Sequence, residues 1–141
     1  MSLETRAKLM QGVAILLGFY ACLWSLAPYT ALNWPARFLI TVSTGTLSEL
    51  AQPLTPLVQW VSVVGAGLLM SLAVICYGII APAIREVNLN ALKLFKMAII
   101  AWYLIDSIGS IAAGFALNLV FNTIFILLIL FPVWGLNENH V

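Results

Sequence analysis

Four long apolar stretches constrain this chain more than any other feature of its sequence. A transmembrane helix needs about 20 consecutive, mostly apolar residues, and this requirement is met at residues 9–27, 57–81, 91–114 and 116–134. Hydrophobic residues make up 63% of the chain and charged residues only 8%, which leaves no stretch polar enough for a separate water-soluble domain. The sequence therefore predicts an all-α, polytopic membrane protein in which residues 1–141 form a single domain, a four-transmembrane-helix bundle.

The segment between the first two predicted spans, residues 28–56, differs from an ordinary loop. It is too apolar for a solvated connection and too short and interrupted for another span. Phe38 and Val42 are one helical turn apart, with Arg37 on another face, a pattern typical of a helix that lies in the membrane interface. We expect an interfacial helix or a re-entrant turn. It either packs over the bundle as a lid or acts as a gate or docking element through its charged residues, Arg37 and Glu49.

The basic residues indicate how the chain is oriented in a membrane. Cytoplasmic loops are enriched in Lys and Arg. With the N-terminus inside, all basic residues except Arg37 are cytoplasmic: Arg6, Lys8, Arg85, Lys93 and Lys96. This distribution predicts a bacterial inner-membrane protein with both termini in the cytoplasm. The group formed by Arg85, Lys93 and Lys96 either fixes the topology and contacts anionic lipids or is a docking site for a cytoplasmic partner.

Asp106 is the only charged residue between residues 97 and 134. An ionisable side chain inside a span costs about 2.5–3.5 kcal/mol on insertion scales and is by default a functional-site candidate. If the third and fourth spans form a hairpin with a tight turn near Gly114, residues equally far from the turn lie at the same depth. We therefore predict a polar seam in the outer half of the bilayer, made by Tyr103, Asp106, Ser107 and Ser110 on one span and Asn118, Asn122 and Thr123 on the next.

Two interpretations of this seam remain open. In the first, Asp106 is hydrogen-bonded to the neighbouring span and joins the two helices, each such bond contributing about 0.6 kcal/mol in membrane proteins. In the second, its carboxyl group binds a proton, a cation or a ligand headgroup in a space that opens outward beneath residues 28–56. No Lys or Arg is expected at the depth of Asp106 to neutralise its charge. The second interpretation therefore has more support here than it has for most single polar residues inside a span.

Several enzyme classes lack their characteristic residues in this sequence. The only histidine, His140, is in the C-terminal tail, so neither a histidine-ligated metal or haem nor a Ser-His-Asp triad is supported. Asp106 with Tyr103 or Ser107 is a weak candidate for acid–base chemistry because no nucleophile–base pair accompanies it. We expect no catalytic residue, no metal and no cofactor. A net charge of +1 gives no reason to expect nucleic acid as a partner.

These features favour a small four-span protein that performs no chemistry of its own. The expected function is that of an accessory or assembly subunit, or of a binder of a lipid or other hydrophobic molecule. An alternative is a proton- or cation-coupled transporter that works as an oligomer, with Asp106 as the titrating group. A lipid-modifying membrane enzyme is the third possibility. The expected partners are membrane lipids and either another membrane protein or a second copy of this chain.

Overall fold

The computed structural model describes residues 1–47, 50 and 52–136. All regular structure within these residues is helical, which confirms the predicted fold class. A π-helical turn, Cys76–Ile80, joins α3 to α4, and a 3-10 turn, Phe131–Val133, extends α6. The helices, in chain order, are α1 (Leu3–Ser25), α2 (Trp34–Thr44), α3 (Pro56–Ile75), α4 (Ala81–Arg85), α5 (Leu89–Ala112) and α6 (Asn118–Leu130).

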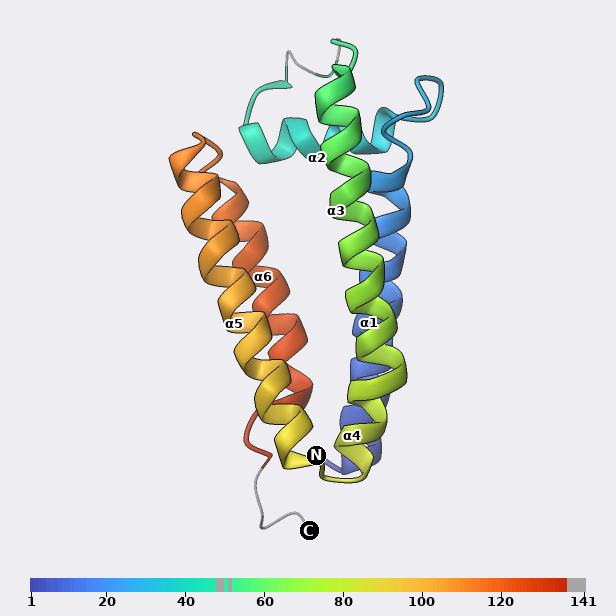
Figure 1. Cartoon of the computed structure of the whole chain (residues 1–141), viewed down its shortest axis with the longest axis vertical. Helices are drawn as coiled ribbons and strands as arrows, with labels where there is room; N and C mark the ends of the chain where they lie inside the picture. Colours follow the sequence, from blue (N-terminus) through green and yellow to red (C-terminus); the bar gives the residue numbers. More distant parts are fainter. Residues whose placement is uncertain (48–49, 51, 137–141) are drawn as a thin grey trace.

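Three of these helices are long and apolar enough to cross a membrane: α1, the continuous helix Pro56–Arg85, and α5. The fourth apolar segment, Asn118–Val133, is shorter. At a rise of about 1.5 Å per residue it measures about 24 Å, against about 30 Å for the hydrocarbon core of a bilayer. Figure 1 shows the consequence: the α5–α6 hairpin ends at the level of α2, whereas α3 extends beyond it.

The second span is longer than the sequence indicates because Pro82 does not end it. A proline inside a helix removes one hydrogen bond and clashes with the carbonyl group four residues earlier, so the sequence predicts a helix that stops at residue 81. The π-helical turn accommodates the ring instead. Its wider winding lets the Ala81 N–H donate to the Cys76 carbonyl, five residues back, and the helix continues to Arg85. Such π-bulges are a known way of accommodating a local disruption of a helix.

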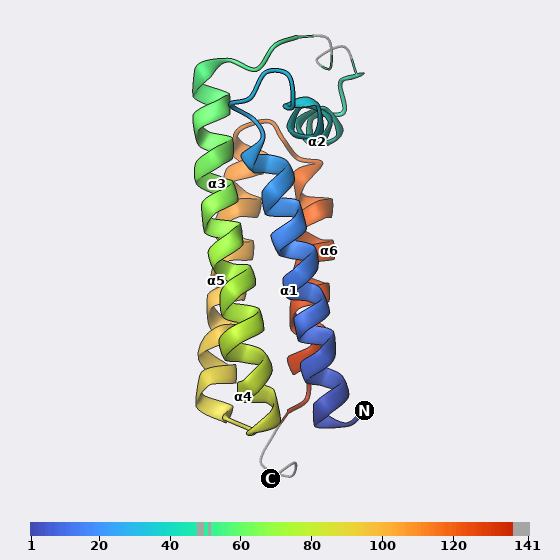
Figure 2. The same cartoon turned by 90° about the vertical axis from the view of Figure 1, so that its right-hand side faces the viewer.

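The long helices form two antiparallel hairpins, one made by α1 with α3 and α4, the other by α5 with α6 (Figures 1 and 2). The hairpins meet near the N-terminus, where α5 contacts α4 and the π-helical turn, and the 3-10 turn contacts α1. Toward the opposite end they diverge (Figure 1). The main apolar core lies where they meet, and its fully buried side chains include Met10, Ile84, Leu92, Ile129 and Val133.

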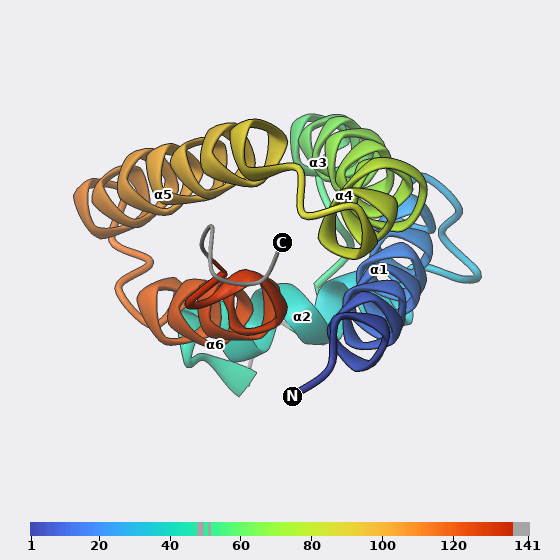
Figure 3. The ribbon, with the colours of Figure 1, turned by 90° about the horizontal axis from the view of Figure 1, so that it is seen from below.

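The two ends of the bundle differ in charge. One end, which we call the basic end, carries the N-terminus, the α4–α5 connection and the side chains of Arg6, Lys8, Arg85, Lys93 and Lys96. The other, which we call the α2 end, carries α2 and the turn between α5 and α6. Helix α2 lies across this end, transverse to the spans, on the side where α1 and α6 are neighbours (Figures 2 and 3). The segment between the first two spans therefore contains a helix that crosses this end of the bundle and does not enter it.

Helix α2 turns its large apolar side chains outward. Trp34 and Phe38 are exposed and stack with ring centroids 5.4 Å apart, whereas Ala36 and Thr41 are fully buried. Large apolar groups on the exposed face suit a helix surrounded by lipid rather than water. An aromatic pair, Tyr20 of α1 and Phe125 of α6, joins the two hairpins, with ring centroids 5.2 Å apart.

Candidate functional site

The predicted polar seam is present between α5 and α6, and its centre is Asp106. The Ser110 hydroxyl donates to Asp106 Oδ1 at 3.1 Å, and the Asn118 side-chain amide donates to the same oxygen at 3.3 Å. That amide also donates to Ser110 Oγ at 2.8 Å. Three side chains from two helices thus form a closed hydrogen-bonded triangle. It lies near the turn because Gly114, with φ of +86°, reverses the chain as the sequence predicts.

A second layer of the seam lies one turn further from the α5–α6 connection. The Asn122 amide donates to Ser107 Oγ at 3.2 Å, and both residues are buried. The Tyr103 and Thr123 hydroxyl groups are 3.1 Å apart, and the Thr123 hydroxyl also donates to the Leu119 carbonyl. Within the described residues neither Tyr103 nor Ser107 is bonded to Asp106, and the hydroxyl group that bonds to it is that of Ser110.

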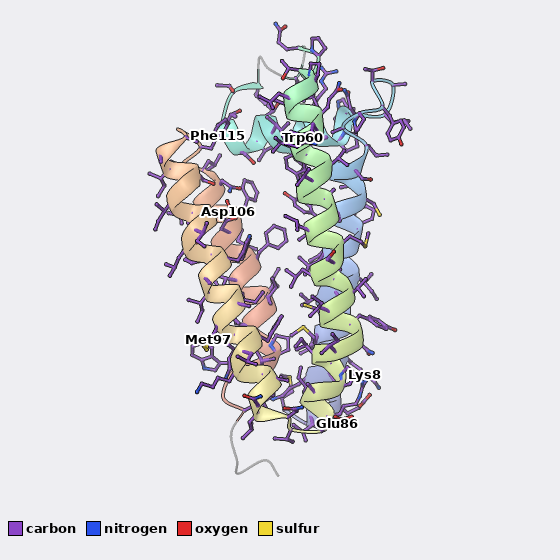
Figure 4. All side chains as sticks on the ribbon, in the orientation of Figure 1. Lys8, Trp60, Glu86, Met97, Asp106 and Phe115 are labelled. Atoms are coloured by element: carbon purple, nitrogen blue, oxygen red, sulfur yellow. The ribbon has the colours of Figure 1, made fainter. Side chains whose placement is uncertain are left out.

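Asp106 is on the face of α5 that turns toward the rest of the bundle. Leu92, Phe95 and Ile99, which belong to the apolar core, precede it at helical spacing on the same face. Figure 4 shows Asp106 between Met97 and Phe115, in the half of α5 nearer to α2. Among the residues that the structure describes, no Lys, Arg or His nitrogen lies within 4 Å of its carboxylate.

The hydrogen bonds of the seam leave acceptors free. In the described structure, Asp106 accepts two donors through Oδ1 and none through Oδ2. The amide groups of Asn118 and Asn122 act as donors in each of the bonds they make there, so their carbonyl oxygens also lack a donor. Since a carboxylate and an amide carbonyl each have two lone-pair positions per oxygen, the seam can accept further hydrogen bonds from a hydroxyl or ammonium group, or coordinate a cation.

The second candidate group, the outer-segment gate, is described only in part. Arg37 is on α2 and half-buried, and its Nε atom is completely buried. No described residue accepts a hydrogen bond from that atom. Glu49 lies outside the described residues, as does His140 of the tail. Thr41 is one helical turn after Arg37, and its buried hydroxyl also lacks a partner within the described residues.

At the basic end the three candidate docking residues differ in their surroundings. Arg85 is already engaged, since its guanidinium group donates to both carboxylate oxygens of Glu4, at 2.8 and 3.4 Å. Lys93 is exposed and Lys96 half-buried, and neither forms an ion pair within the described part of the chain. Arg85 therefore links α4 to α1, and only the two lysines present free charge.

Arg6 has a structural role that the sequence did not reveal. Its Nη1 donates to the Pro132 carbonyl at 3.1 Å and to the Trp134 carbonyl at 2.7 Å. These carbonyl groups are at the end of α6 and its 3-10 turn, where no backbone N–H of the described residues satisfies them. Arg6 thus has two roles. By the positive-inside rule its charge indicates the orientation of the chain, and its side chain also joins the two hairpins. No spacing rule connects residues this far apart in the chain.

The described residues contain no group of three or more His, Cys, Asp or Glu side chains placed to hold a metal ion. The seam is therefore an array of neutral polar groups around one carboxylate. Comparisons of the chain with protein-family models, with curated proteins and with solved structures found no match.

Proposed function

We propose that this chain is a non-enzymatic membrane protein that binds a lipid or another amphipathic molecule at its α2 end, with the seam as the polar anchor. The observation that carries this proposal is the half-satisfied carboxylate of Asp106, which is held by Ser110 and Asn118 through one oxygen and has its other oxygen free. At hydrocarbon depth an ionisable group needs compensating partners. A ligand that donates a hydrogen bond to Oδ2 supplies one.

The divergence of the hairpins supports the same proposal. Their apolar core lies toward the basic end, and α5 makes its main contacts with the first hairpin at α4 and the π-helical turn. Nearer to α2, Tyr103, Asp106 and Ser110 on the inner face of α5 are only partly buried. An acyl chain can therefore approach between the hairpins from the bilayer while its polar end reaches the seam.

We further propose that the basic end faces the cytoplasm of a bacterial inner membrane. This orientation follows the positive-inside rule, because Arg37 is on α2 whereas the other basic residues are at the opposite end. It places both termini in the cytoplasm and the seam in the outer leaflet. The exposed Lys93 and the half-buried Lys96 then face anionic lipid headgroups or a cytoplasmic partner.

A proton- or cation-coupled transporter that works as an oligomer is the second candidate. The same free oxygen of Asp106 favours it, because a carboxylate with an open coordination position can take up a proton or a cation. The Asp106→Asn substitution separates the two proposals. In this variant the single carboxamide oxygen accepts from Ser110 and Asn118, and an N–H donor takes the place of Oδ2. A lipid hydroxyl can bond to that group by accepting instead of donating, but the carboxamide cannot titrate, so lipid binding persists in the variant whereas coupled transport is lost.

The proposal is tested by extracting the full-length protein in mild detergent and recording native mass spectra of the wild type, Asp106→Leu, Asp106→Asn and Ser71→Ala. Ser71 is a suitable control because it is exposed on α3 and bonds only to the Gly67 carbonyl within the described structure. We expect one lipid or small molecule per chain in the wild type, Asp106→Asn and Ser71→Ala, and its loss in Asp106→Leu. Equal retention by wild type and Asp106→Leu contradicts the proposal.

Two other outcomes of the same spectra identify a different function. A stoichiometric second protein, retained by all four forms, makes the chain an accessory or assembly subunit. A ligand-free oligomer that moves protons or cations when reconstituted in liposomes, and stops doing so in Asp106→Asn, makes it a transporter. Either result replaces the lipid-binding proposal.

A further inference from the structure

The buried face of α2 carries a row of polar groups that neither the seam nor the bundle core uses. Asn33, Arg37 and Thr41 are four residues apart, so they lie on one side of the helix, from its N-cap to its third turn. The exposed fraction of Asn33 is 3% and that of Thr41 is 1%. The Nε atom of Arg37 between them is also buried.

These groups lack hydrogen-bond partners within the described residues. The Arg37 Nε and the Thr41 hydroxyl make no hydrogen bond there, and Asn33, although it is the N-cap of α2, makes no capping bond with its side chain. Buried polar groups in folded proteins are almost always paired, and an exception calls for a specific explanation such as an absent ligand. Two such groups, one helical turn apart on one face, therefore point to a ligand rather than to a single packing defect.

The chemistry of the row selects an oxyanion. A guanidinium group presents its Nε–H and an Nη–H in parallel, a geometry that matches two oxygens of a phosphate or carboxylate. The Thr41 hydroxyl and the Asn33 amide add neutral donors on either side. The row has a single positive charge, and no carboxylate lies within 4 Å of it among the described residues.

The position of α2 indicates that the oxyanion belongs to a lipid. Trp34 and Phe38 of the same helix are exposed and stack on each other, as expected of aromatic side chains at the level of the headgroups. We propose that Arg37, Thr41 and Asn33 bind the phosphate oxyanion of an anionic phospholipid whose acyl chains lie against the diverging hairpins. This inference rests on the proposed lipid-binding function and specifies the charge of the ligand.

The experiment uses the full-length protein in a non-ionic detergent and three probes: dioctanoyl phosphatidylglycerol, dioctanoylglycerol and inorganic phosphate. The second probe keeps the acyl chains without the phosphate, and the third keeps the phosphate without the chains. Binding is measured by native mass spectrometry for the wild type, Arg37→Gln, Arg37→Lys, Thr41→Val and two controls. The control Lys8→Gln removes an exposed charge elsewhere, and Ser43→Ala alters α2 outside the row.

We expect dioctanoyl phosphatidylglycerol to bind at least tenfold more tightly than dioctanoylglycerol to the wild type. Removal of a hydrogen bond to a charged group predicts a loss of about tenfold or more in Arg37→Gln. A smaller loss is expected in Arg37→Lys, which keeps the charge but not the paired N–H groups, and in Thr41→Val. Both controls should bind like the wild type. Because Arg37→Lys and Thr41→Val are mild changes, a general loss of folding cannot produce this graded order.

Other outcomes overturn the inference or change the source of the oxyanion. Equal binding of the two dioctanoyl lipids, or equal losses in Arg37→Gln and Lys8→Gln, contradicts it. If inorganic phosphate binds as tightly as the phospholipid and depends equally on Arg37, the site serves a free anion and the lipid assignment is wrong. The Asp106→Leu variant separates this inference from the proposed function: phospholipid binding that needs Arg37 but not Asp106 supports the α2 site and rejects the seam as the anchor.

Discussion

Asn118 donates its side-chain amide to the Asp106 carboxylate at 3.3 Å and to Ser110 at 2.8 Å, so one residue of α6 holds two residues of α5. Within the described structure, no other side chain of α6 bonds to two side chains of α5. It also fixes one carboxylate oxygen of Asp106 and leaves the other free. The same contact therefore contributes both to the stability of the hairpin and to the arrangement of the candidate site.

The first prediction concerns this link. Asn118→Ala removes two interhelical hydrogen bonds, and measured values for such bonds in membrane proteins indicate a loss of about 1 kcal/mol in the free energy of unfolding. Unfolding in mixed micelles with increasing SDS measures the change. Asn90→Ala is the matched control because Asn90 is exposed and its side chain makes no hydrogen bond within the described residues. Equal effects of the two substitutions contradict the structural role of Asn118.

The second prediction separates the role of Asp106 as a hydrogen-bond acceptor from the role of its negative charge, by using two substitutions that remove these properties one at a time. Asp106→Asn keeps an oxygen that accepts from Ser110 and Asn118, so its unfolding free energy should stay within about 0.5 kcal/mol of the wild-type value. Asp106→Leu leaves both donors without an acceptor and should lower it by about 1–3 kcal/mol. The same SDS titration checks both values. A large loss in Asp106→Asn shows that the negative charge itself is needed for folding.

The third prediction concerns Arg6, which joins the two hairpins at the basic end. Arg6→Gln removes the charge-assisted bonds to the Pro132 and Trp134 carbonyl groups, and we expect a loss of about 2–3 kcal/mol in the free energy of unfolding. Lys8→Gln is the control, since the Lys8 side chain is 71% exposed and its surface ion pair contributes about 0.5 kcal/mol or less. If both variants unfold alike, Arg6 acts only through its charge.

The fourth prediction follows from two helix ends with the same hydrogen-bond pattern. After α5, Gly114 has a φ of +86° while Phe115 N–H donates to the Ser110 carbonyl. After α4, Val87 occupies the equivalent position with a φ of +50°, and Asn88 N–H donates to the Ala83 carbonyl. This is a Schellman motif, which favours glycine at the left-handed position, and a β-branched residue there is strained.

Val87→Gly should therefore stabilise the protein. Strain at such a position is about 1–3 kcal/mol, and part of the gain is offset by the greater freedom of glycine in the unfolded chain, so we expect a net gain of about 1 kcal/mol. The reverse substitution, Gly114→Val, should destabilise the hairpin by about as much or more. Thermal unfolding in detergent measures both, and a destabilised Val87→Gly variant contradicts the assignment of strain to Val87.

The sequence predicts the parts of this structure that depend on local pattern. The apolar stretches and Gly114 predict that the third and fourth spans form a tight hairpin. Residues equally far from the turn of such a hairpin lie at the same depth, so the sequence places Asp106, Ser110 and Asn118 together. The sequence does not predict that the helix continues through Pro82, since the π-helical turn that accommodates the ring has no simple signature. Nor does it predict the Arg6 contacts with the end of α6, because they depend on how the two hairpins pack.

The most direct test of the account is to map where a photoreactive lipid attaches. A phosphatidylglycerol with a diazirine in its acyl chain is added to the full-length protein in nanodiscs, irradiated, and located by peptide mass spectrometry. We predict labelling concentrated on the facing halves of α3, α5 and α6 nearest to α2, and a clear decrease there in Asp106→Leu. Labelling spread evenly over exposed residues of all spans, including Leu9 and Leu16 of α1, and unchanged in Asp106→Leu, contradicts a lipid site at the α2 end.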